Sequence, residues 1–360
     1  MKKLVLFIML SLFSCTKSLN LTKTESKLLS TEKEINKVTF LSCGDNLIHH
    51  TVYKSSYNDG YYDFKPILKN VKSYISAHDL AFINQETILG GSEIGLSTYP
   101  RFNSPYEVGD ALIDSGFNLI SLANNHTLDR GLEAINNSLI YWKQQQVIFS
   151  GSEIEQAMDV KLFTKNGIKF AFVAYTYGTN GIKVPVDKAY LVNLFTFDKA
   201  INDLNYARQN ADVVIVSMHW GAEYYNHPNS SQIEQAQFLN SLGVDIIVGH
   251  HPHVIQPFDI IEANNHKTYV VYSLGNFLSD QTGIDRLIGM MFSLDISKNQ
   301  NNIIINNPLA KLFYTYKNDV GKFENIFFSD LADHILPDYA YHFARKKTLI
   351  QEYNDEINVI

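Results

Sequence analysis

The stretch DIIVGHHPHVIQP, residues 245–257, holds three histidines within five positions, His250, His251 and His253. The chain has twelve histidines, so a quarter of them directly follow the apolar run 246–248. Neutral imidazole is the commonest metal ligand among side chains. Three histidines around a proline at a strand end therefore favour a metal site, with an exposed loop as the alternative.

Five further apolar runs are also followed at once by polar or metal-competent side chains. These are Asp45 after 38–43, Glu86 after 80–84, Asn124, Asn125, His126 and Asp129 after 119–123, His219 after 213–218, and Asn276 after 268–274. In open α/β sheets, sites form outside the carboxyl ends of the strands. Each element alone has a plainer interpretation, such as a turn at Asp45, a helix cap at Glu86 or a core histidine at His219. Their recurrence at six strand ends indicates one shared site.

The side chains at these strand ends form a set of oxygen and nitrogen ligands without thiolate. Such a set suits Mn²⁺, Fe²⁺ or Zn²⁺ rather than Ca²⁺ or a cysteine-based structural zinc. A pair of cations needs a bridging carboxylate, which either Asp45 or Glu86 could supply. Dinuclear centres hold their ions about 3.5–4 Å apart and hydrolyse phosphate esters or amides. The sequence therefore predicts divalent metal ions, two of them, as cofactors.

The apolar runs that carry these side chains predict buried strands. The runs are 38–43, 80–84, 119–123, 147–150, 169–175, 213–218, 245–249 and 268–274. Most of them do not alternate between apolar and polar residues, which is typical of strands buried on both faces.

Segments with helical spacing separate many of the strands, at 64–78, 106–116 and 230–243. Gly116 and Gly243 are predicted to end the last two, and a serine cap at Ser230 to open the last. Strand–helix alternation indicates an α/β fold. After residue 290, we expect antiparallel strands around an Asn-rich turn, and then a helical tail from about Asp330.

Six motifs together resemble a known family. CGDNLIHH, FINQETILGG, LANNHTLDRG, SMHWGAEY, VGHHPHVIQP and YSLGNFLSD follow one another between residues 38 and 282. They are similar to the successive motifs of CapA-type capsule proteins, which are named for poly-γ-glutamate synthesis and belong to the calcineurin-like metallophosphatase superfamily. The resemblance implies two β-sheets packed as a sandwich and flanked by helices, a four-layer fold with a dinuclear centre at the strand ends.

The same resemblance assigns a role to each matching residue. The implied metal ligands are Asp45, Glu86 as the bridging carboxylate, Asn125, His219, His251 and His253. His126 matches the catalytic acid, and the nearby Asp129 is predicted to orient its imidazole. One position departs from the superfamily, because its first motif is Asp-x-His and Leu47 stands two residues after Asp45. One ligand is thus missing, and its place is open to His250 or to water.

The function implied is that of a surface-anchored, metal-dependent hydrolase in capsule or poly-γ-glutamate biosynthesis, acting on a phosphoester or a polymer amide. The expected partners are an anionic polymer or phosphorylated substrate and the capsule synthesis machinery. One alternative is a non-catalytic assembly factor that binds polymer and metal, which Leu47 leaves open. A second is an envelope-binding lipoprotein with a vestigial site, against which the intact His219, His251 and His253 argue.

Residues 1–15, MKKLVLFIMLSLFSC, are typical of a secretory signal, with two lysines before a short apolar stretch. Cys15 at its end resembles the lipidated cysteine of bacterial lipoproteins, and an ordinary cleaved signal is the alternative. The polar residues 16–37 predict a tether. We therefore expect export to the cell envelope and anchoring in the membrane through a lipid on Cys15.

The remaining organisation follows from composition and motif position. Residues 38–290 are predicted to form the metallophosphatase-like domain, and residues 291–360 to complete it with strands and a helical tail. Hydrophobic residues make up 45% of the 360, and charged residues 19%, which indicates a globular protein with a large core. The net charge is −7 and no long basic run occurs, which argues against a nucleic-acid partner.

Overall fold

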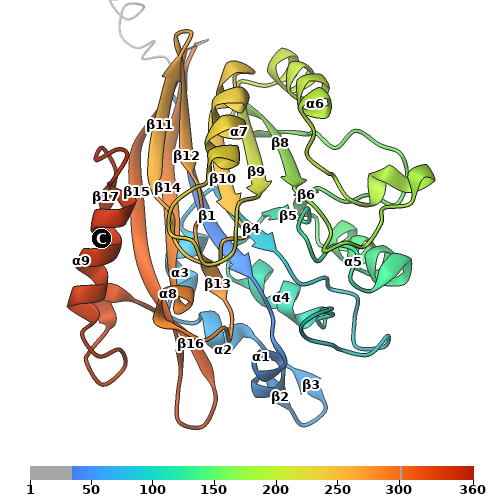
Figure 1. The fold of residues 1–360 in the computed structure, drawn as a ribbon, viewed down its shortest axis with the longest axis vertical. Helices are drawn as coiled ribbons and strands as arrows, with labels where there is room; N and C mark the ends of the chain where they lie inside the picture. The colour runs from blue at the N-terminus through green and yellow to red at the C-terminus, as the bar shows by residue number, and fades with distance from the viewer. Residues whose placement is uncertain (1–34, 301) are drawn as a thin grey trace, which may run out of the picture. The chain divides into compact units, whose positions relative to one another are not determined.

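Two β-sheets lie face to face in the computed structural model, which describes residues 35–300 and 302–360 (Figure 1). The first sheet has the strand order β16-β15-β14-β1-β4-β5-β6, with β13 beside β1 and β17 beside β15. The second has the order β11-β12-β10-β9-β8-β7. The predicted signal peptide, Cys15 and tether residues 16–34 lie outside the described residues.

All eight predicted strands are confirmed, with ends that shift by up to three residues. The first sheet comprises β1 (Asn36–Asn46), β4 (Leu80–Gln85), β5 (Leu119–Ser121), β6 (Ile148–Ser150), β13 (Asn276–Leu278), β14 (Ile288–Asn299), β15 (Asn302–Lys317), β16 (Phe323–Phe327) and β17 (Asn358–Val359). The second comprises β7 (Lys161–Lys165), β8 (Ile168–Thr176), β9 (Val213–His219), β10 (Ile246–His250), β11 (Phe258–Ala263) and β12 (His266–Val271). A separate short hairpin is formed by β2 (Tyr57–Asn58) and β3 (Tyr61–Tyr62).

The helices are α1 (His50–Ser55), α2 (Lys65–Leu68), α3 (Lys72–Ser76), α4 (Glu107–Asp114), α5 (Gly131–Gln144), α6 (Phe197–Asn210), α7 (Ser230–Ser241), α8 (Ile284–Leu287) and α9 (Tyr339–Ile350), with 3₁₀ turns η1 (Val186–Leu191) and η2 (Phe328–Asp330). The single helix predicted over 64–78 is wrong, because α2 and α3 are separate short helices. The cap predicted at Ser230 is also wrong. Asn229 caps α7, since its side chain accepts from the backbone N–H of Gln232.

Three hydrophobic clusters separate four layers, which confirms the predicted sandwich flanked by helices. The central cluster joins the two sheets and includes Phe82 from β4 and Phe172 from β8, whose rings lie 5.8 Å apart. A second cluster packs α2, α3, α4 and α5 against the outer face of the first sheet. A third packs α6 and α7 against the outer face of the second. Strands covered on both faces need apolar residues on both, which explains their continuous apolar runs.

The direction of the strands determines where the polar side chains gather. In the first sheet β1, β4, β5 and β6 run parallel, and in the second β8, β9, β10 and β12 run parallel. The antiparallel neighbours β14, β11 and β7 lie outside these parallel sets. The segments that carry the predicted site residues therefore leave the two sheets at the carboxyl ends of parallel strands.

Two glycines permit a close approach of backbones just before the predicted ligands. A Cβ at Gly44 would lie 1.8 Å from the carbonyl oxygen of Gly275, and a Cβ at Gly249 would lie 2.0 Å from that of Tyr272. These contacts involve main-chain atoms, so no side-chain rotation can relieve them. Gly44 thus lets β1 pair with the segment leading into β13, where the Asp45 N–H donates to the Gly275 carbonyl at 3.0 Å.

We predict that Gly44→Ala lowers the free energy of unfolding by about 1–3 kcal/mol, because the added methyl overpacks the backbone contact. Chemical denaturation measures this loss. The matched control is Gly178→Ala, since a Cβ there meets nothing within 4 Å and its backbone is not in the left-handed region. Equal stability of the two variants would contradict the role given to Gly44.

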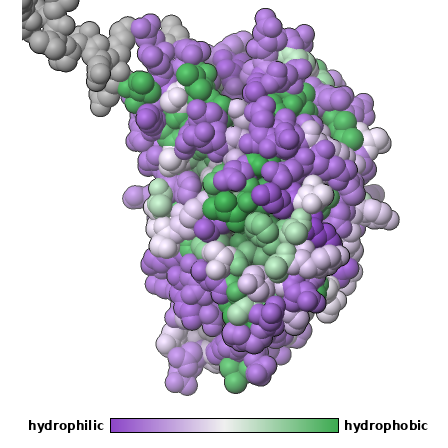
Figure 2. Space-filling model, turned by 90° about the vertical axis from the view of Figure 1, so that its left-hand side faces the viewer, coloured by the Kyte–Doolittle hydropathy of each residue, from purple (hydrophilic) through white to green (hydrophobic). Residues whose placement is uncertain are grey.

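Residues after β13 complete the same compact unit, which spans Asn36–Ile360. The antiparallel pair β14–β15 confirms the strands predicted after residue 290. The tail contains the helix α9, but this helix begins at Tyr339 rather than near Asp330 and is followed by strand β17. Figure 1 shows α9 on the opposite side of the molecule from α5 and α6. The face turned toward the viewer in Figure 2 has a hydrophobic area near its centre and further hydrophobic residues toward its upper end, among hydrophilic ones. Among the described residues, no helix has the length and apolar character needed to cross a membrane.

A buried ion pair joins α9 to α8. Lys346 is fully buried, and its Nζ lies 3.2 Å from Asp285 Oδ1, while Arg345 pairs with the same carboxylate. Burial lowers the pKa of Lys346 to about 8, although the charge of Asp285 opposes this shift. The folded-state pKa lies below the unfolded value of about 10.4. The charged lysine therefore destabilises the fold at neutral pH, and this cost disappears as the pH rises through 8 to 10.

We predict that Lys346→Met raises the free energy of unfolding at pH 7 by about 1–3 kcal/mol, because it replaces a buried charge by an apolar group of similar volume. The gain should shrink toward pH 10. Denaturation curves at both pH values measure it, with Lys347→Met as the control at the adjacent, half-buried position. A Lys346→Met protein that is less stable than wild type at pH 7 would show that the ion pair is net stabilising.

Candidate metal centre

One carboxylate oxygen lies between two histidines from different strand ends. Glu86 Oε1 is 3.7 Å from His219 Nε2 and 3.7 Å from His253 Nε2. With metal–ligand bonds of about 2.1 Å, two ligand atoms of one ion lie roughly 3–4 Å apart. Glu86 follows β4 directly and is fully buried. Its oxygen thus lies within the spacing of two metal ligands from a histidine at each of two strand ends.

Asp45, near the end of β1, contacts His250 and His253, and these three residues form a first group beside Glu86. Asp45 Oδ2 lies 3.1 Å from His253 Nδ1, and its Oδ1 lies 3.3 Å from His250 Nδ1. The amide of Asn84 donates to Oδ1 at 2.8 Å, and the backbone N–H of His251 donates to Oδ2 at 3.2 Å. Asp45 therefore connects the first sheet to the loop that follows β10 in the second.

His219, the last residue of β9, lies next to Asn125 and His251, and these three residues form a second group beside Glu86. His219 Nε2 lies 2.9 Å from Asn125 Oδ1, and its ring centroid is 4.9 Å from that of His251. Asn125 follows β5 in the first sheet, so this group also joins the two sheets. The Tyr177 ring lies 4.8 Å from the His251 ring and is half-exposed, so it borders the group toward solvent.

The loop after β10 supplies the two remaining predicted ligands. One atom each from Glu86, His251 and His253 lie within 4.8 Å of one another, a grouping that could hold a metal ion. His251 and His253 adopt φ values of +96° and +57°. Such backbone conformations cost energy in non-glycine residues and cluster at functional sites, where the surroundings enforce them. The structure thus brings all six predicted ligands together, while metal binding by each stays a prediction.

Leu47 stands where the superfamily has its first-motif histidine, and its buried side chain offers no ligand atom. His250 is fully buried with its ring stacked on Phe82, 5.3 Å between centroids. Its Nδ1 lies 3.3 Å from Asp45 Oδ1. His250 is therefore close enough to Asp45 to replace the first-motif histidine as a metal ligand. His49, two residues after Leu47, packs edge-on against Phe102, whose ring also contacts His126 at 4.8 Å.

His126 and Asp129 form a buried pair beside the ligand cluster. His126 Nδ1 lies 2.7 Å from Asp129 Oδ2, which also accepts from the backbone N–H of Phe102 at 2.7 Å. Within residues 35–300 and 302–360, Nε2 of His126 makes no hydrogen bond. Asn180 lies between this pair and the ligands, since its Oδ1 accepts from Asn125 Nδ2 at 3.1 Å and its Nδ2 lies 3.5 Å from His126 Nδ1. The structure therefore places both predicted catalytic residues next to Asn125.

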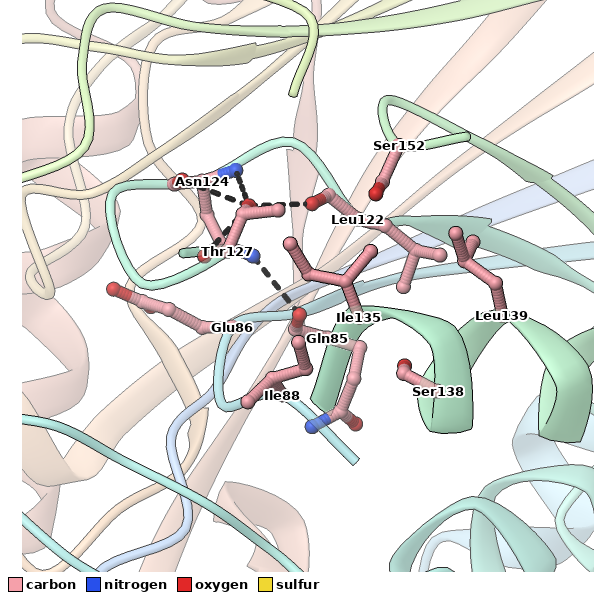
Figure 3. A pocket seen from close by; sticks show the side chains of 10 residues that line it. All are labelled: Gln85, Glu86, Ile88, Leu122, Asn124, Thr127, Ile135, Ser138, Leu139 and Ser152. Atoms are coloured by element: carbon pink, nitrogen blue, oxygen red, sulfur yellow. Dashed lines mark hydrogen bonds between the residues drawn. The ribbon is translucent and has the colours of Figure 1, made fainter. Parts of the chain in front are cut away.

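The loop that carries Asn125 and His126 is held by Asn124 and Thr127 (Figure 3). Asn124 Nδ2 donates to the Gln85 carbonyl at 3.0 Å, and Asn124 Oδ1 accepts from the His126 N–H at 2.9 Å. Thr127 Oγ1 donates to the Leu122 carbonyl at 2.7 Å. A cavity of about 20 Å³ is lined by Glu86, Ser138 and Leu139 among others. The Glu86 carboxylate points away from the side of this cavity that Ser138 and Leu139 form (Figure 3). That volume suits a single water, so it is not a substrate pocket.

Burial and neighbouring charges set opposite protonation tendencies for the two carboxylates. Burial raises the pKa of Glu86 well above its usual range, and the negative charge of Asp45 adds to the effect. Burial also acts to raise the pKa of Asp45. Hydrogen bonds and positive charge from His250 and His253 outweigh the effect of burial and hold this pKa well below the usual range. Without a cation, Asp45 is thus the charged member of the pair.

The histidines are shifted in different directions. Burial, and then the proximity of His253, lower the pKa of His251 to about 4, and burial and His251 lower that of His219 well below its usual value. Burial acts to lower the pKa of His253 as well, but the charge of Glu86 and the hydrogen bond to Asp45 raise it to about 9. His219 and His251 are therefore neutral at pH 7, the form that binds metals.

The donors of the cluster fit a divalent cation. Both carboxylate oxygens of Glu86, both ring nitrogens of His250 and Nδ1 of His251 are buried without a hydrogen-bond partner among the described residues. Buried polar atoms left unpaired are costly and rare. Oxygen and nitrogen donors without thiolate suit Mn²⁺, Fe²⁺ or Zn²⁺. A bound cation would satisfy the atoms that the protein itself leaves without partners.

Three asparagines around the ligands were not assigned roles from the sequence. Asn84 contacts Asp45, Asn180 links Asn125 to His126, and Asn276 Oδ1 lies 3.0 Å from His253 Nδ1. Asn276 was already among the strand-end side chains that the sequence singles out, and Asn84, two residues before Glu86 near the end of β4, carries the same signal. Asn180 lies in the loop after β8, and no local pattern marks it.

The profile of the family described as "Bacterial capsule synthesis protein PGA_cap" matches residues 39–281. The chain belongs to this family. The matched residues run from β1 to just after β13, and so include every member of the ligand cluster. This confirms the family resemblance seen in the motifs.

Two CapA proteins of Bacillus species are similar to the chain over part of their length. The chain is 32% identical over 183 residues to the PGA biosynthesis protein CapA of Bacillus subtilis (strain 168), covering 47% of this chain and 44% of that protein. It is 32% identical over 181 residues to the capsule biosynthesis protein CapA of Bacillus anthracis, covering 49% and 43%. Each match thus spans less than half of the relative.

Among solved structures, a putative 5'-nucleotidase from Staphylococcus aureus is similar with a TM-score of 0.48 and 15% identity, covering 87% of this chain and 58% of that one. At this level the similarity carries no conclusion about the site.

We predict that the purified protein holds Mn, Fe or Zn at about one to two equivalents. His251→Ala and Asp45→Ala should lower this content while most of the fold remains. Glu86→Gln should lower it most strongly, because Glu86 contacts both groups, whereas His219→Ala should affect one group only. Elemental analysis and circular dichroism on the same preparations measure both properties.

Glu262→Gln serves as the control for loss of a carboxylate, because Glu262 is an exposed residue of β11. Folded Glu86→Gln protein that keeps the full wild-type metal content would contradict the shared position of Glu86.

Proposed function

We propose that this protein is a metal-dependent hydrolase of the bacterial cell envelope, acting in capsule or poly-γ-glutamate biosynthesis. Its substrate would be a phosphoester or an amide bond of an anionic polymer. The observation that carries this proposal is the position of Glu86 Oε1, 3.7 Å from both His219 and His253, beside the His126–Asp129 pair. Family membership supports the biosynthetic context.

One cation would be held by Asp45, Glu86 and His253. A second would be held by Asn125, His219 and His251, together with Glu86. When bound, a pair of divalent cations supplies Lewis-acid activation of the bond that is cleaved and of the attacking water. Neutral His219 and His251 hold lone pairs ready for such ions. The deep burial of all six side chains limits the access of bulk water to the reacting atoms.

His126 would act as the general acid. With the proton on Nδ1, the ring donates to Asp129 at 2.7 Å, so the carboxylate fixes the ring orientation. Nε2, which has no partner among the described residues, then holds the proton that the leaving oxygen or nitrogen needs. The Phe102 ring packs edge-on against the imidazole at 4.8 Å and restricts its rotation.

A non-catalytic role in polymer assembly or binding is the second candidate. The observation that favours it is Leu47, a buried apolar residue that replaces one ligand of the superfamily pattern. Turnover of an aryl phosphate or of a γ-linked glutamate oligomer by Mn²⁺-loaded protein separates the two candidates. Hydrolysis of either substrate favours the enzyme, and binding without hydrolysis favours assembly.

Export and anchoring in the membrane belong to the same proposal. They rest on the signal-like residues 1–15 and on Cys15 as the site of lipidation, all outside the described residues. An anchored hydrolase would meet an anionic polymer or a phosphorylated precursor at the membrane surface, together with the capsule synthesis machinery.

We predict that His126→Ala lowers kcat by about 10²–10⁴-fold, the usual contribution of a general acid, while the metal content stays near that of wild type. Asp129→Asn should give a smaller loss, because the ring keeps its proton-carrying atom but loses orientation. Asn125→Ala should differ from both and lower the metal content.

Steady-state kinetics and elemental analysis on the same preparations test this set, with His334→Ala as an exposed histidine control. Loss of metal in His126→Ala would make His126 a ligand, and an unchanged kcat would remove it from the mechanism.

A further inference from the structure

Arg286 presents a guanidinium group beside the metal centre that no described acidic residue neutralises. Its Cζ lies 3.8 Å from the centroid of the Tyr224 ring, a stacked cation–π contact. Nη1 donates to the Thr282 carbonyl at 2.7 Å. Arg286 forms no ion pair within residues 35–300 and 302–360, and it is half-buried. A cation held in this way keeps donors free for a ligand.

Tyr224 brings this cation close to the ligand His253. The Tyr224 ring centroid lies 6.2 Å from that of His253, and the Tyr224 N–H donates to the Pro252 carbonyl at 2.8 Å. Pro252 immediately precedes His253. Tyr224 is 42% exposed, so the stack stands between the buried cluster and solvent.

Asn276 provides a second link between Arg286 and the same ligand. Its Oδ1 lies 3.0 Å from His253 Nδ1, and its Nδ2 donates to the backbone carbonyl of Arg286 at 2.9 Å. Gln281 extends the network, because its Oε1 accepts from Asn276 and its Nε2 donates to the Tyr224 hydroxyl at 3.4 Å. Two independent contacts therefore fix the place of Arg286 relative to His253.

Nearby acidic groups are engaged elsewhere. Asp285 pairs with Arg345 and Lys346 on α9, and Asp280 pairs with Lys317 of β15. Burial, and then a hydrogen bond to Glu223 and its charge, raise the pKa of the Tyr224 hydroxyl to about 12, while Glu223 forms no ion pair with Arg286 among the described residues. The positive charge of Arg286 thus remains available at the border of the site.

We propose that Arg286 binds an oxyanion of the substrate, a carboxylate or a phosphate, adjacent to the bond that is cleaved, which rests on the proposed hydrolase function. The planar guanidinium can donate two parallel hydrogen bonds to either group. Stacking on Tyr224 reduces the freedom that the side chain would lose on binding. Polymers of acidic residues and phosphorylated precursors both carry such a group, so Arg286 selects anionic substrates.

The test measures equilibrium binding and turnover separately. Mn²⁺-loaded full-length protein is titrated calorimetrically with inorganic phosphate and with a γ-linked glutamate oligomer. We expect Arg286→Gln to weaken binding of at least one probe by about 10- to 100-fold, the loss expected for hydrogen bonds to a charged group. Arg286→Lys should retain part of the affinity, because it keeps the charge but not the planar pair of donors.

Lys143→Gln on α5 is the control for loss of one positive charge, since Lys143 is exposed on the outer layer. Metal content should stay at the wild-type level in all three variants, because Asn276 contacts the backbone of Arg286 and not its side chain. The probe that loses affinity identifies the source of the oxyanion, phosphate or polymer carboxylate.

Two results would overturn the proposal. The first is wild-type affinity of Arg286→Gln for both probes, and the second is failure of the wild-type protein to bind either probe. Absence of turnover by the wild-type protein would instead remove the hydrolase function. Weakened binding by Arg286→Gln would still be measured in that case, so the two failures are distinguishable.

Discussion

The buried carboxylate of Glu86 sets the main physical constraint on this structure. It is fully buried in a cluster with four histidines and a second carboxylate, and both of its oxygens lack hydrogen-bond partners among the described residues. A buried charge without partners is costly in a low-dielectric interior. A cation bound beside Glu86 and the neighbouring histidines would remove that cost, which is the physical reason for proposing a metal here.

The rest of the fold serves to bring these donors together from two sheets. Parallel strands of each sheet end at the cluster, and Asp45 contacts the loop after β10 across the sandwich. Close backbone contacts at Gly44 and Gly249 bring these strand ends within reach of the ligands. Around the donors, Asn124 and Asn276 contact the loops that carry His126 and His253, and Asn84 joins β4 to Asp45 of β1.

Much of this arrangement follows from local patterns in the sequence. Continuous apolar runs identify strands that are buried on both faces, and polar residues just after them identify the edge where the site forms. Gly116 and Gly243, with φ of +105° and +79°, end their helices as the pattern predicts. The family resemblance adds the sandwich and the roles of the ligands, which neither periodicity nor spacing can supply.

Other features depend on tertiary contacts or on weaker signals. Helices α5 and α6 were not among the predicted elements, although Thr196 caps α6 and Ile135, Leu139 and Trp142 repeat at helical spacing in α5. The break between α2 and α3 has no glycine or proline at residues 69–71 to announce it. Arg286 and Tyr224 stand 62 positions apart in the numbering, so only the folded chain shows that they stack beside His253.

The most direct test of the account is anomalous X-ray scattering from crystals grown with Mn²⁺. The account predicts two peaks about 3.5–4 Å apart, with the Glu86 carboxylate between them, one peak next to Asp45 and His253 and the other next to Asn125 and His219. A single peak remote from Glu86, or no peak in well-ordered crystals, would contradict it.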